Sequence, residues 1–184
     1  KEQGVLKMIA LAAGKEGLES YLNNLWIVAV SISYEYDPTD ILKVPELLAK
    51  QADEEYIKSE NEDFNSILKG ALGQKKHIHI HAAQAFHIET LEEQSTNQVL
   101  QRIVAHLDRE IQTNYKLWPT NYVAHDLLTN SSKYKAHYTE HDRQQFERRL
   151  RMRVNVEDRK AVESFLNMYA RPVLNKEQLA SIPI

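Results

Sequence analysis

The sequence has no cysteine among its 184 residues. This absence excludes disulfide bonds, thiolate nucleophiles and zinc sites with cysteine ligands, and it is compatible with a reducing compartment. No apolar run approaches the ~18 residues that a membrane-spanning helix needs. The net charge of −3 is small, so nothing in the overall charge attracts nucleic acid or an anionic surface. We therefore expect a soluble chain without thiol chemistry and without a nucleic-acid partner.

The amino-terminal part alternates helical and strand patterns. Glu2–Ala13 and Lys15–Leu25 have the spacing of helices. They lead into Ile27–Ile32, a β-branched run that predicts a fully buried strand. A turn then precedes a helix to about Lys50, with Thr39 or Asp40 as its cap. Helices that flank a buried strand are typical of the α/β class.

A second strand is predicted over Lys75–Ala83, and only helical patterns follow from Ser95 onward. A long amphipathic helix should come first, with Thr96 as its N-terminal cap. Further helices are expected at Pro119–Leu128, His141–Met152 and Glu157–Tyr169, the last ending before Pro172. We expect two domains, an α/β portion over residues 1–92 and a helical extension over 93–184.

Three histidines alternate with isoleucines in the second predicted strand. Alternation puts His77, His79 and His81 on one face, where they are weak candidates for metal ligands. His87 could join them only if a hairpin turned at Ala82–Ala85. The preferred interpretation is structural, with both isoleucines in the core and the histidines facing solvent or polar neighbours.

Another group of polar side chains follows the first strand, in the segment Tyr34-Glu-Tyr-Asp37. Open α/β sheets place their binding crevice at the carboxyl ends of strands. These carboxylates and phenols could orient a polar substrate, or they could form a capped turn with exposed tyrosines. Both interpretations stay open.

The segment from Trp26 to Pro38, read as Trp-Ile-Val-Ala-Val-Ser-Ile-Ser-Tyr-Glu-Tyr-Asp-Pro, resembles the last conserved block of the glycerolipid acyltransferases. Gln3–Met8 is similar to the segment that follows the substrate block of that family. Lys116–Leu128 is similar to the downstream region of a bacterial subgroup, the 1-acyl-glycerol-3-phosphate acyltransferases. The chain thus resembles the carboxyl-terminal part of such an enzyme, with the tail of a mixed sheet, flanking helices and a helical subdomain.

The resemblance implies transfer of a fatty acyl group from acyl-CoA or acyl carrier protein to glycerol phosphate or lysophosphatidate. It implies no further cofactor, and a place on the cytoplasmic side of the membrane, or in the cytoplasm for this soluble part alone, with the membrane surface as a candidate partner. The catalytic histidine and aspartate are expected upstream, so we assign no catalytic residue here and expect the chain alone to be inactive. Ser33, Tyr34 and Glu35 are the candidate substrate-binding residues.

His137 and Asp142 match the family's His-x4-Asp spacing by string alone. They lie about a hundred residues after the strand, whereas the family places its pair before it, so we interpret the match as coincidental, with Thr139 or Asp142 capping a helix.

The arginines from Arg143 to Arg153 could lie on anionic lipid, but interspersed carboxylates favour a solvated face. The alternative functions are a histidine-rich metal-binding module and a helical protein-interaction module without enzymatic activity.

Overall fold

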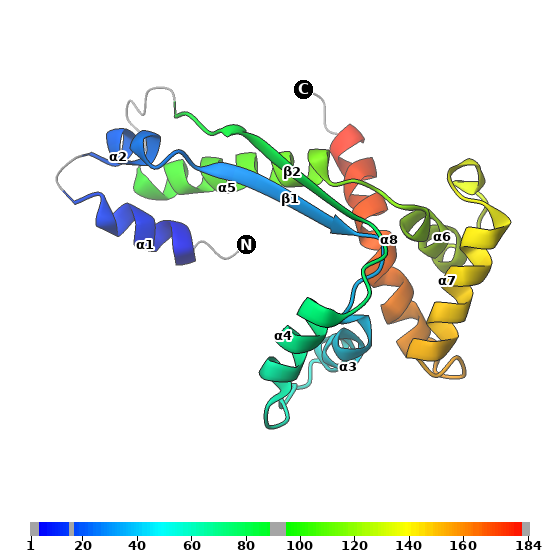
Figure 1. The fold of residues 1–184 in the computed structure, drawn as a ribbon. Coiled ribbons are helices and arrows are strands. Elements are labelled where there is room, and N and C mark those ends of the chain that lie inside the picture. Colours follow the sequence, from blue (N-terminus) through cyan, green and yellow to red (C-terminus); the bar gives the residue numbers. More distant parts are fainter. Residues whose placement is uncertain (1–3, 15–16, 89–94, 182–184) are drawn as a thin grey trace. The chain divides into compact units, whose positions relative to one another are not determined.

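The computed structural model describes residues 4–14, 17–88 and 95–181 (Figure 1). It is a mixed α/β structure that is mostly helical, with one small antiparallel sheet, so the expected α/β class is confirmed in this coarse form. The elements in chain order are α1 (Gly4–Ala12), α2 (Leu18–Asn24), β1 (Val28–Tyr34), α3 (Asp40–Gln51), α4 (Glu62–Leu72), β2 (Ile78–Ala85), α5 (Thr96–Asn114), α6 (Pro119–Leu128), the 3-10 helix η1 (Lys135–His137), α7 (Glu140–Arg153) and α8 (Arg159–Ser181).

Contacts within the chain define two compact units, and each is built from two separate stretches of sequence. The first unit holds the described residues up to Ile32 together with those of Ile80–Tyr115. The second unit holds Ser33–His79 and the described residues from Lys116 onward. This division differs from the expected boundary near residue 92, because the chain leaves the first unit along β1 and returns to it along β2.

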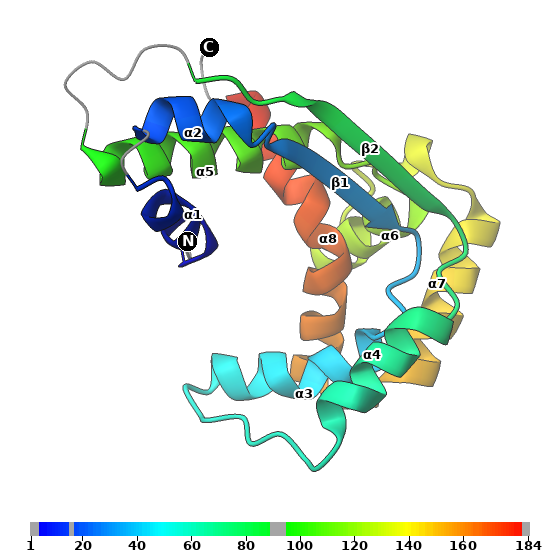
Figure 2. The ribbon, with the colours of Figure 1, turned by 60° about the vertical axis from the view of Figure 1, so that its left-hand side comes forward.

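The sheet consists of β1 and β2 alone (Figure 2). The Glu35 N–H donates to the His77 carbonyl at 2.9 Å, and the Phe86 N–H donates to the Ile27 carbonyl at 2.7 Å, which sets the antiparallel register. In this register the odd-numbered residues of the first strand form the hydrogen bonds to β2. The backbone N–H and C=O groups of its even-numbered residues therefore point to the opposite edge of the strand.

The prediction that Ile27–Ile32 is buried on both faces is wrong. Side chains of β1 alternate between buried and exposed, and Val28, Val30 and Ile32 are 43%, 46% and 45% exposed. Successive side chains of a strand point to opposite faces, and here the covered face carries the small residues. The prediction that the isoleucines of the second strand enter the core is also wrong, because Ile78 and Ile80 are 51% and 64% exposed.

The core of the first unit forms between α2, α5 and the segment after β2. Its buried members are Leu22, Ile88, Val99, Leu100 and Ile103. A capping box begins α5, but its cap is Ser95 instead of the expected Thr96. Ser95 accepts a hydrogen bond from the Gln98 N–H, and the Gln98 side chain accepts one from the Ser95 N–H.

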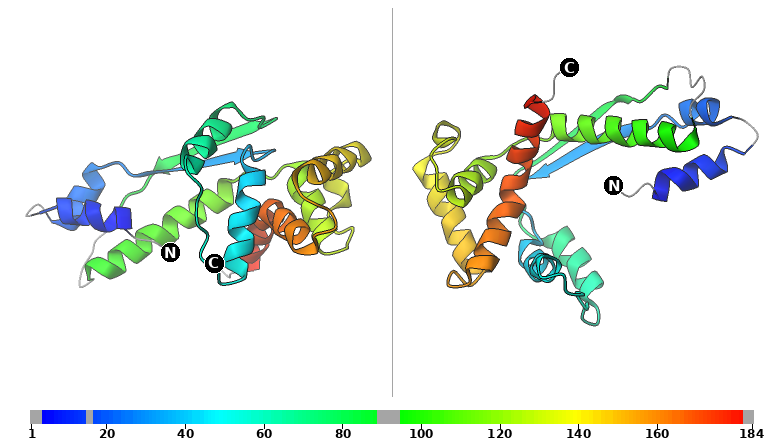
Figure 3. Two further views of the ribbon diagram at one scale, coloured as in Figure 1. Left: turned by 90° about the horizontal axis from the view of Figure 1, so that it is seen from below. Right: turned by 180° about the vertical axis from the view of Figure 1, so that it is seen from behind.

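The core of the second unit lies among α3, α6, α7 and α8 (Figure 3). Phe146 and Phe165 are fully buried there, and Val173 is 1% exposed. The prediction that the last helix ends before Pro172 is wrong, since α8 continues to Ser181 with this proline inside. Val173, directly after the proline, is buried, and its packing offsets part of the cost of the backbone hydrogen bond that proline removes. Within the described stretches, no helix has the length and apolar character needed to cross a bilayer.

Candidate functional site

The end of β1 carries a buried carboxylate with two nitrogen partners, all in the second unit. The Glu35 side chain is 3% exposed. Lys76 Nζ lies 2.5 Å from one of its oxygens and His77 Nδ1 lies 2.5 Å from the other. Thr120 Oγ1 donates to the Glu35 carbonyl at 2.9 Å, which connects this end of the strand to α6. A carboxylate buried in this way is stabilised because both oxygens have charge-assisted partners. We refer to Glu35, Lys76 and His77 as the Glu35 cluster.

His77 belongs to this cluster but remains accessible. Its side chain is 65% exposed. Its ring stacks on Trp118, with centroids 5.6 Å apart, and Lys116 Nζ lies 4.3 Å from the Trp118 centroid. In the described part of the chain no hydrogen bond occupies His77 Nε2, whereas Nδ1 faces Glu35. A carboxylate on one ring nitrogen orients an imidazole so that the other can bind a ligand or exchange a proton.

The turn after β1 is held by Asp37. One of its oxygens accepts hydrogen bonds of 2.8 Å from both the N–H and the hydroxyl of Thr39, and the other pairs with Lys43. Burial acts to raise the pKa of Asp37, but the bonds from Lys43 and Thr39 outweigh it, so the pKa lies below its usual range. Asp37 is therefore ionised at neutral pH and stabilises the turn that presents the Glu35 cluster.

A second buried carboxylate, Asp40, begins α3 and is fully buried. It lies 2.7 Å from a guanidinium nitrogen of Arg149 on α7 and 3.4 Å from Arg153 Nε, and it accepts a 2.9 Å hydrogen bond from the Tyr169 hydroxyl on α8. The same hydroxyl accepts the Asp37 N–H at 3.0 Å, and Arg149 donates to the Asp37 carbonyl at 2.9 Å. Burial first, and then the charge of Asp40, raises the pKa of Tyr169, so this phenol stays protonated. These contacts join the turn to two helices and give Asp40 a structural role.

The structure places the three candidate substrate-binding residues in different environments. Ser33 is fully buried, and its hydroxyl has no hydrogen-bond partner among the described residues. Tyr34 is half-buried, with Lys75 Nζ 6.0 Å from its ring centroid. Only Glu35 takes part in a cluster with an accessible member. Glu35 and His77 were expected at separate sites, and the register of the sheet brings them together.

The row of histidines does not converge. His79 and His81 are half-buried, and no group of three or more histidine, cysteine or acidic side chains in the described ranges could hold a metal ion. No hairpin turns at Ala82–Ala85, because β2 continues through Ala85. In the first unit, His87 lines a pocket of about 480 Å³ together with His81 and His106.

His137 and Asp142, which match the His-x4-Asp spacing, lie at the start of α7. Thr139 caps α7 by accepting the Asp142 N–H at 3.2 Å, and Asp142 accepts the Thr139 N–H at 2.9 Å, so the capping interpretation is confirmed. His137 stacks on Tyr122 of α6, with centroids 4.4 Å apart. Asp142 forms the cap, and among the described residues no hydrogen bond joins it to His137.

The charged helix α7 has two exposed arginines, two half-buried ones and one that is buried. Phe146 and Leu150 form the expected apolar stripe and face the core, while Arg148 and Arg151 are exposed. Arg149 is the buried one, with its guanidinium against Asp40. Sequence reasoning missed this residue, since a buried arginine cannot be told from a solvated one inside a basic run.

Lys76, Trp118 and Thr120 were also missed as members of the site. Lys76 and Thr120 contact Glu35, and Trp118 contacts His77, each across more than 40 residues of sequence. No local pattern marks such a contact. No family model, curated protein or solved structure matches this chain. The site therefore has to be interpreted from its own geometry.

Proposed function

We propose that this chain is the carboxyl-terminal part of a glycerolipid O-acyltransferase. The intact enzyme would move a fatty acyl group from acyl-CoA or acyl carrier protein to glycerol phosphate or lysophosphatidate. Its catalytic histidine and aspartate would lie outside these residues. The observation that supports the proposal is that the segment from Trp26 to Pro38, on which the resemblance depends, contains the strand Val28–Tyr34 and is followed directly by the Glu35 cluster at the carboxyl end of that strand.

The chemistry of this cluster suits a phosphorylated, polyhydroxylated acceptor. An ammonium group and an imidazole are held side by side by Glu35, and Nε2 of the exposed imidazole has no hydrogen bond within the described part of the chain. A phosphate monoester would be attracted to Lys76 and to protonated His77, and a glycerol hydroxyl could donate to neutral His77. In this proposal the cluster binds and positions the acceptor, and it supplies no general base for the acyl transfer.

The exposed face of β1 supports the further proposal that an acyltransferase-type sheet is completed by other elements. Within the first unit, Val28, Val30, Ile32 and Ile80 expose 43–64% of their surface. An apolar sheet face is normally covered by a second layer, and an isolated pair of strands is marginal in water. Further strands and helices of an intact enzyme would cover this face.

The proposal is tested by expressing the protein from its native reading frame and measuring transfer of a labelled acyl group. The assay combines each donor, acyl-CoA or acyl carrier protein, with each acceptor, glycerol 3-phosphate or lysophosphatidate. We expect His77→Gln to raise the acceptor KM about tenfold, because a charge-assisted hydrogen bond contributes about 1.5–3 kcal/mol, and to leave the donor KM unchanged.

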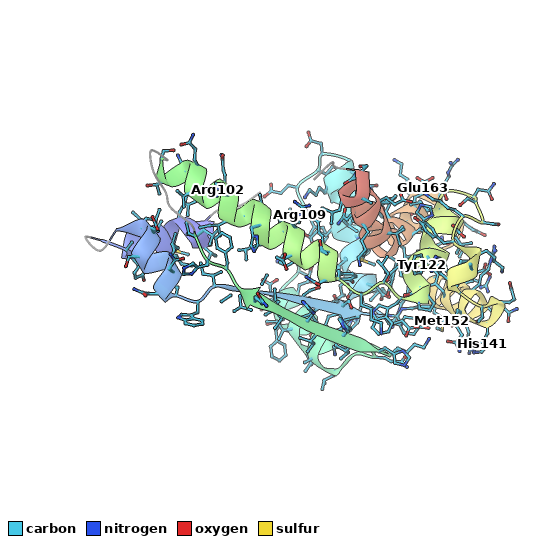
Figure 4. The ribbon with its side chains drawn as sticks, turned by 90° about the horizontal axis from the view of Figure 1, so that it is seen from above. Arg102, Arg109, Tyr122, His141, Met152 and Glu163 are labelled. Carbon is cyan, nitrogen blue, oxygen red and sulfur yellow. The ribbon has the colours of Figure 1, made fainter. Side chains whose placement is uncertain are left out.

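His141→Gln is the matched control. His141 is an exposed histidine on α7, in the same unit (Figure 4), and among the described residues its ring forms a hydrogen bond with Gln145 alone. We expect this variant to behave like the parent. A folded protein that transfers no acyl group with any of the four substrate pairs would overturn the proposal.

A further inference from the structure

Helix α4 in the second unit has an apolar stripe on its exposed side. The stripe consists of Phe64, Ile67, Leu68 and Leu72, which are 64%, 72%, 44% and 78% exposed. Their spacing of three or four residues puts them on one side of the helix. A surface helix normally turns such a stripe toward the core, but no residue of α4 is buried. We refer to these four side chains as the α4 stripe.

The opposite side of α4 is the one that packs on the unit. Glu62, Ser66 and Gly70, each four residues apart, are half-buried. A Cβ on Gly70 would lie 3.8 Å from Thr39 Cγ2, so this side of the helix faces the residue that precedes α3. At 3.6 residues per turn, these three residues and the α4 stripe lie on opposite sides of the helix. The rest of the second unit therefore leaves the α4 stripe uncovered.

The charges around α4 are divided between its two ends. Glu60, Glu62 and Asp63 lie at the amino end, and Lys69 and Lys75 lie toward the carboxyl end. Within the described part of the chain, Glu60 and Lys69 are exposed and belong to no ion pair. Two copies of α4 that pair antiparallel would place each acidic end beside a basic end and would also oppose the two helix dipoles. A parallel pair would put like charges together.

The same charges disfavour a lipid surface as the cover of the α4 stripe. Helices that lie on membranes carry lysine and arginine on their polar side, whereas the amino end of α4 is acidic and would be repelled by anionic head groups. A partner is favoured that has an apolar stripe of the same length between an acidic and a basic end. A second copy of this chain has these properties.

We propose that the chain self-associates through the α4 stripe, which pairs antiparallel with the α4 stripe of a second copy. Such a pair has a twofold axis, so both copies contribute the same residues. Leu68, in the middle of the stripe, lies near the axis and faces its own counterpart, while Phe64 faces the counterpart of Leu72. The stripe is smaller than a standard interface, which buries about 800 Å² per partner, so the dimer is weak. This association goes beyond the proposed function and does not depend on acyl transfer.

Sedimentation velocity of the 184-residue chain tests the association. We expect the average mass to rise from monomer toward dimer in the micromolar concentration range, as a weak interface requires. Ile67→Glu should weaken the association by about tenfold or more, because a carboxylate would enter an apolar contact without a partner. Met152→Glu is the matched control, since Met152 is a 64% exposed apolar side chain on α7 of the same unit (Figure 4). It should associate like the parent.

Introduced cysteines test the antiparallel orientation. The sequence has no cysteine, so each new thiol is the only one in the chain. Under mild oxidation, Leu68→Cys should form a disulfide between two copies. Phe64→Cys and Leu72→Cys should each fail to do so alone but form a mixed disulfide when combined. Positions 64 and 72 lie about 12 Å apart along the helix, so an antiparallel pair keeps like positions beyond the roughly 7 Å between Cα atoms that a disulfide can span.

Three results would each overturn the proposal: a monomer at all concentrations, equal association of Ile67→Glu and the parent, or disulfides of Phe64→Cys and of Leu72→Cys with themselves. A monomer that binds phosphatidylcholine vesicles, and loses this binding in Ile67→Glu, would also overturn it and would assign the α4 stripe to a lipid surface.

Discussion

The buried pair of Asp40 and Arg149 gives the sharpest prediction about stability. Asp40 is fully buried, and Arg149 is 5% exposed. Arg149→Met would keep most of the side-chain volume but remove the guanidinium that faces Asp40 at 2.7 Å. The carboxylate would retain the Tyr169 hydroxyl and Arg153, whose Nε lies farther away at 3.4 Å. Breaking one side of a buried ion pair typically costs about 3–5 kcal/mol, because a charge is left uncompensated.

This cost is large beside the total free energy of unfolding, which is about 5–15 kcal/mol for ordinary domains. For a chain of this length, each kcal/mol shifts Tm by roughly 2–4 °C. We therefore expect Arg149→Met to lower Tm by roughly 10 °C, measured by circular dichroism and checked by urea unfolding. Tyr169→Phe should cost less, about 1–2 kcal/mol, because it removes a hydroxyl and leaves the ion pair intact.

Two further variants separate the pair from its surroundings. Arg148→Met, on the exposed face of α7, is the control and should change Tm little. The double variant Asp40→Leu with Arg149→Met removes both charges and should recover much of the loss, since apolar replacement of a buried pair is often neutral. A loss below about 1 kcal/mol for Arg149→Met, or no recovery in the double variant, would refute the reasoning.

Three other predictions concern separate elements. Thr139→Ala removes the cap of α7 and should cost about 1 kcal/mol in urea unfolding; an unchanged midpoint would contradict the capping role. Gly73→Ala should lower Tm, because a Cβ there would lie 2.6 Å from Pro38 Cβ; a stable variant would show that the turn yields. Burial acts to raise the pKa of Asp126, but hydrogen bonds from the Tyr134 N–H and other donors hold it below its usual range. Its contribution is therefore present above the unfolded pKa of about 3.9 and lost as pH falls through the lower folded value; Asp126→Asn should flatten the acid limb of the stability curve, and an identical limb would sink this assignment.

Much of the secondary structure follows from local patterns. Pro119–Leu128 is predicted residue for residue, because proline at the first helical position marks the start of α6. The strand starting near Ile27 and the helix from Asp40 are also found, with ends shifted by one or two residues. Pro172 shows the limit of such patterns, since tertiary packing of α8 outweighs the local penalty.

The orientation of the strands could not be predicted from β-branched runs. Hydrophobicity indicates that a face will be covered in the complete fold, but the structure covers the face with Ala29, Ser31 and Ser33 and leaves the valines exposed. Part of the site could be predicted from the sequence, since Glu35 was selected for its place at a strand end. Its contacts with the residues at positions 76 and 77 could not, because they depend on a strand register that no local signal reveals.

The most direct test of the central claim is acyl transfer by the protein expressed from its native reading frame, with the acceptor KM compared between the parent, His77→Gln and His141→Gln. The account predicts transfer to glycerol 3-phosphate or lysophosphatidate, with an acceptor KM about tenfold higher for His77→Gln alone. A folded protein with no transfer to either acceptor would contradict the assignment to the acyltransferases. Transfer with the same acceptor KM in all three proteins would remove the Glu35 cluster from acceptor binding.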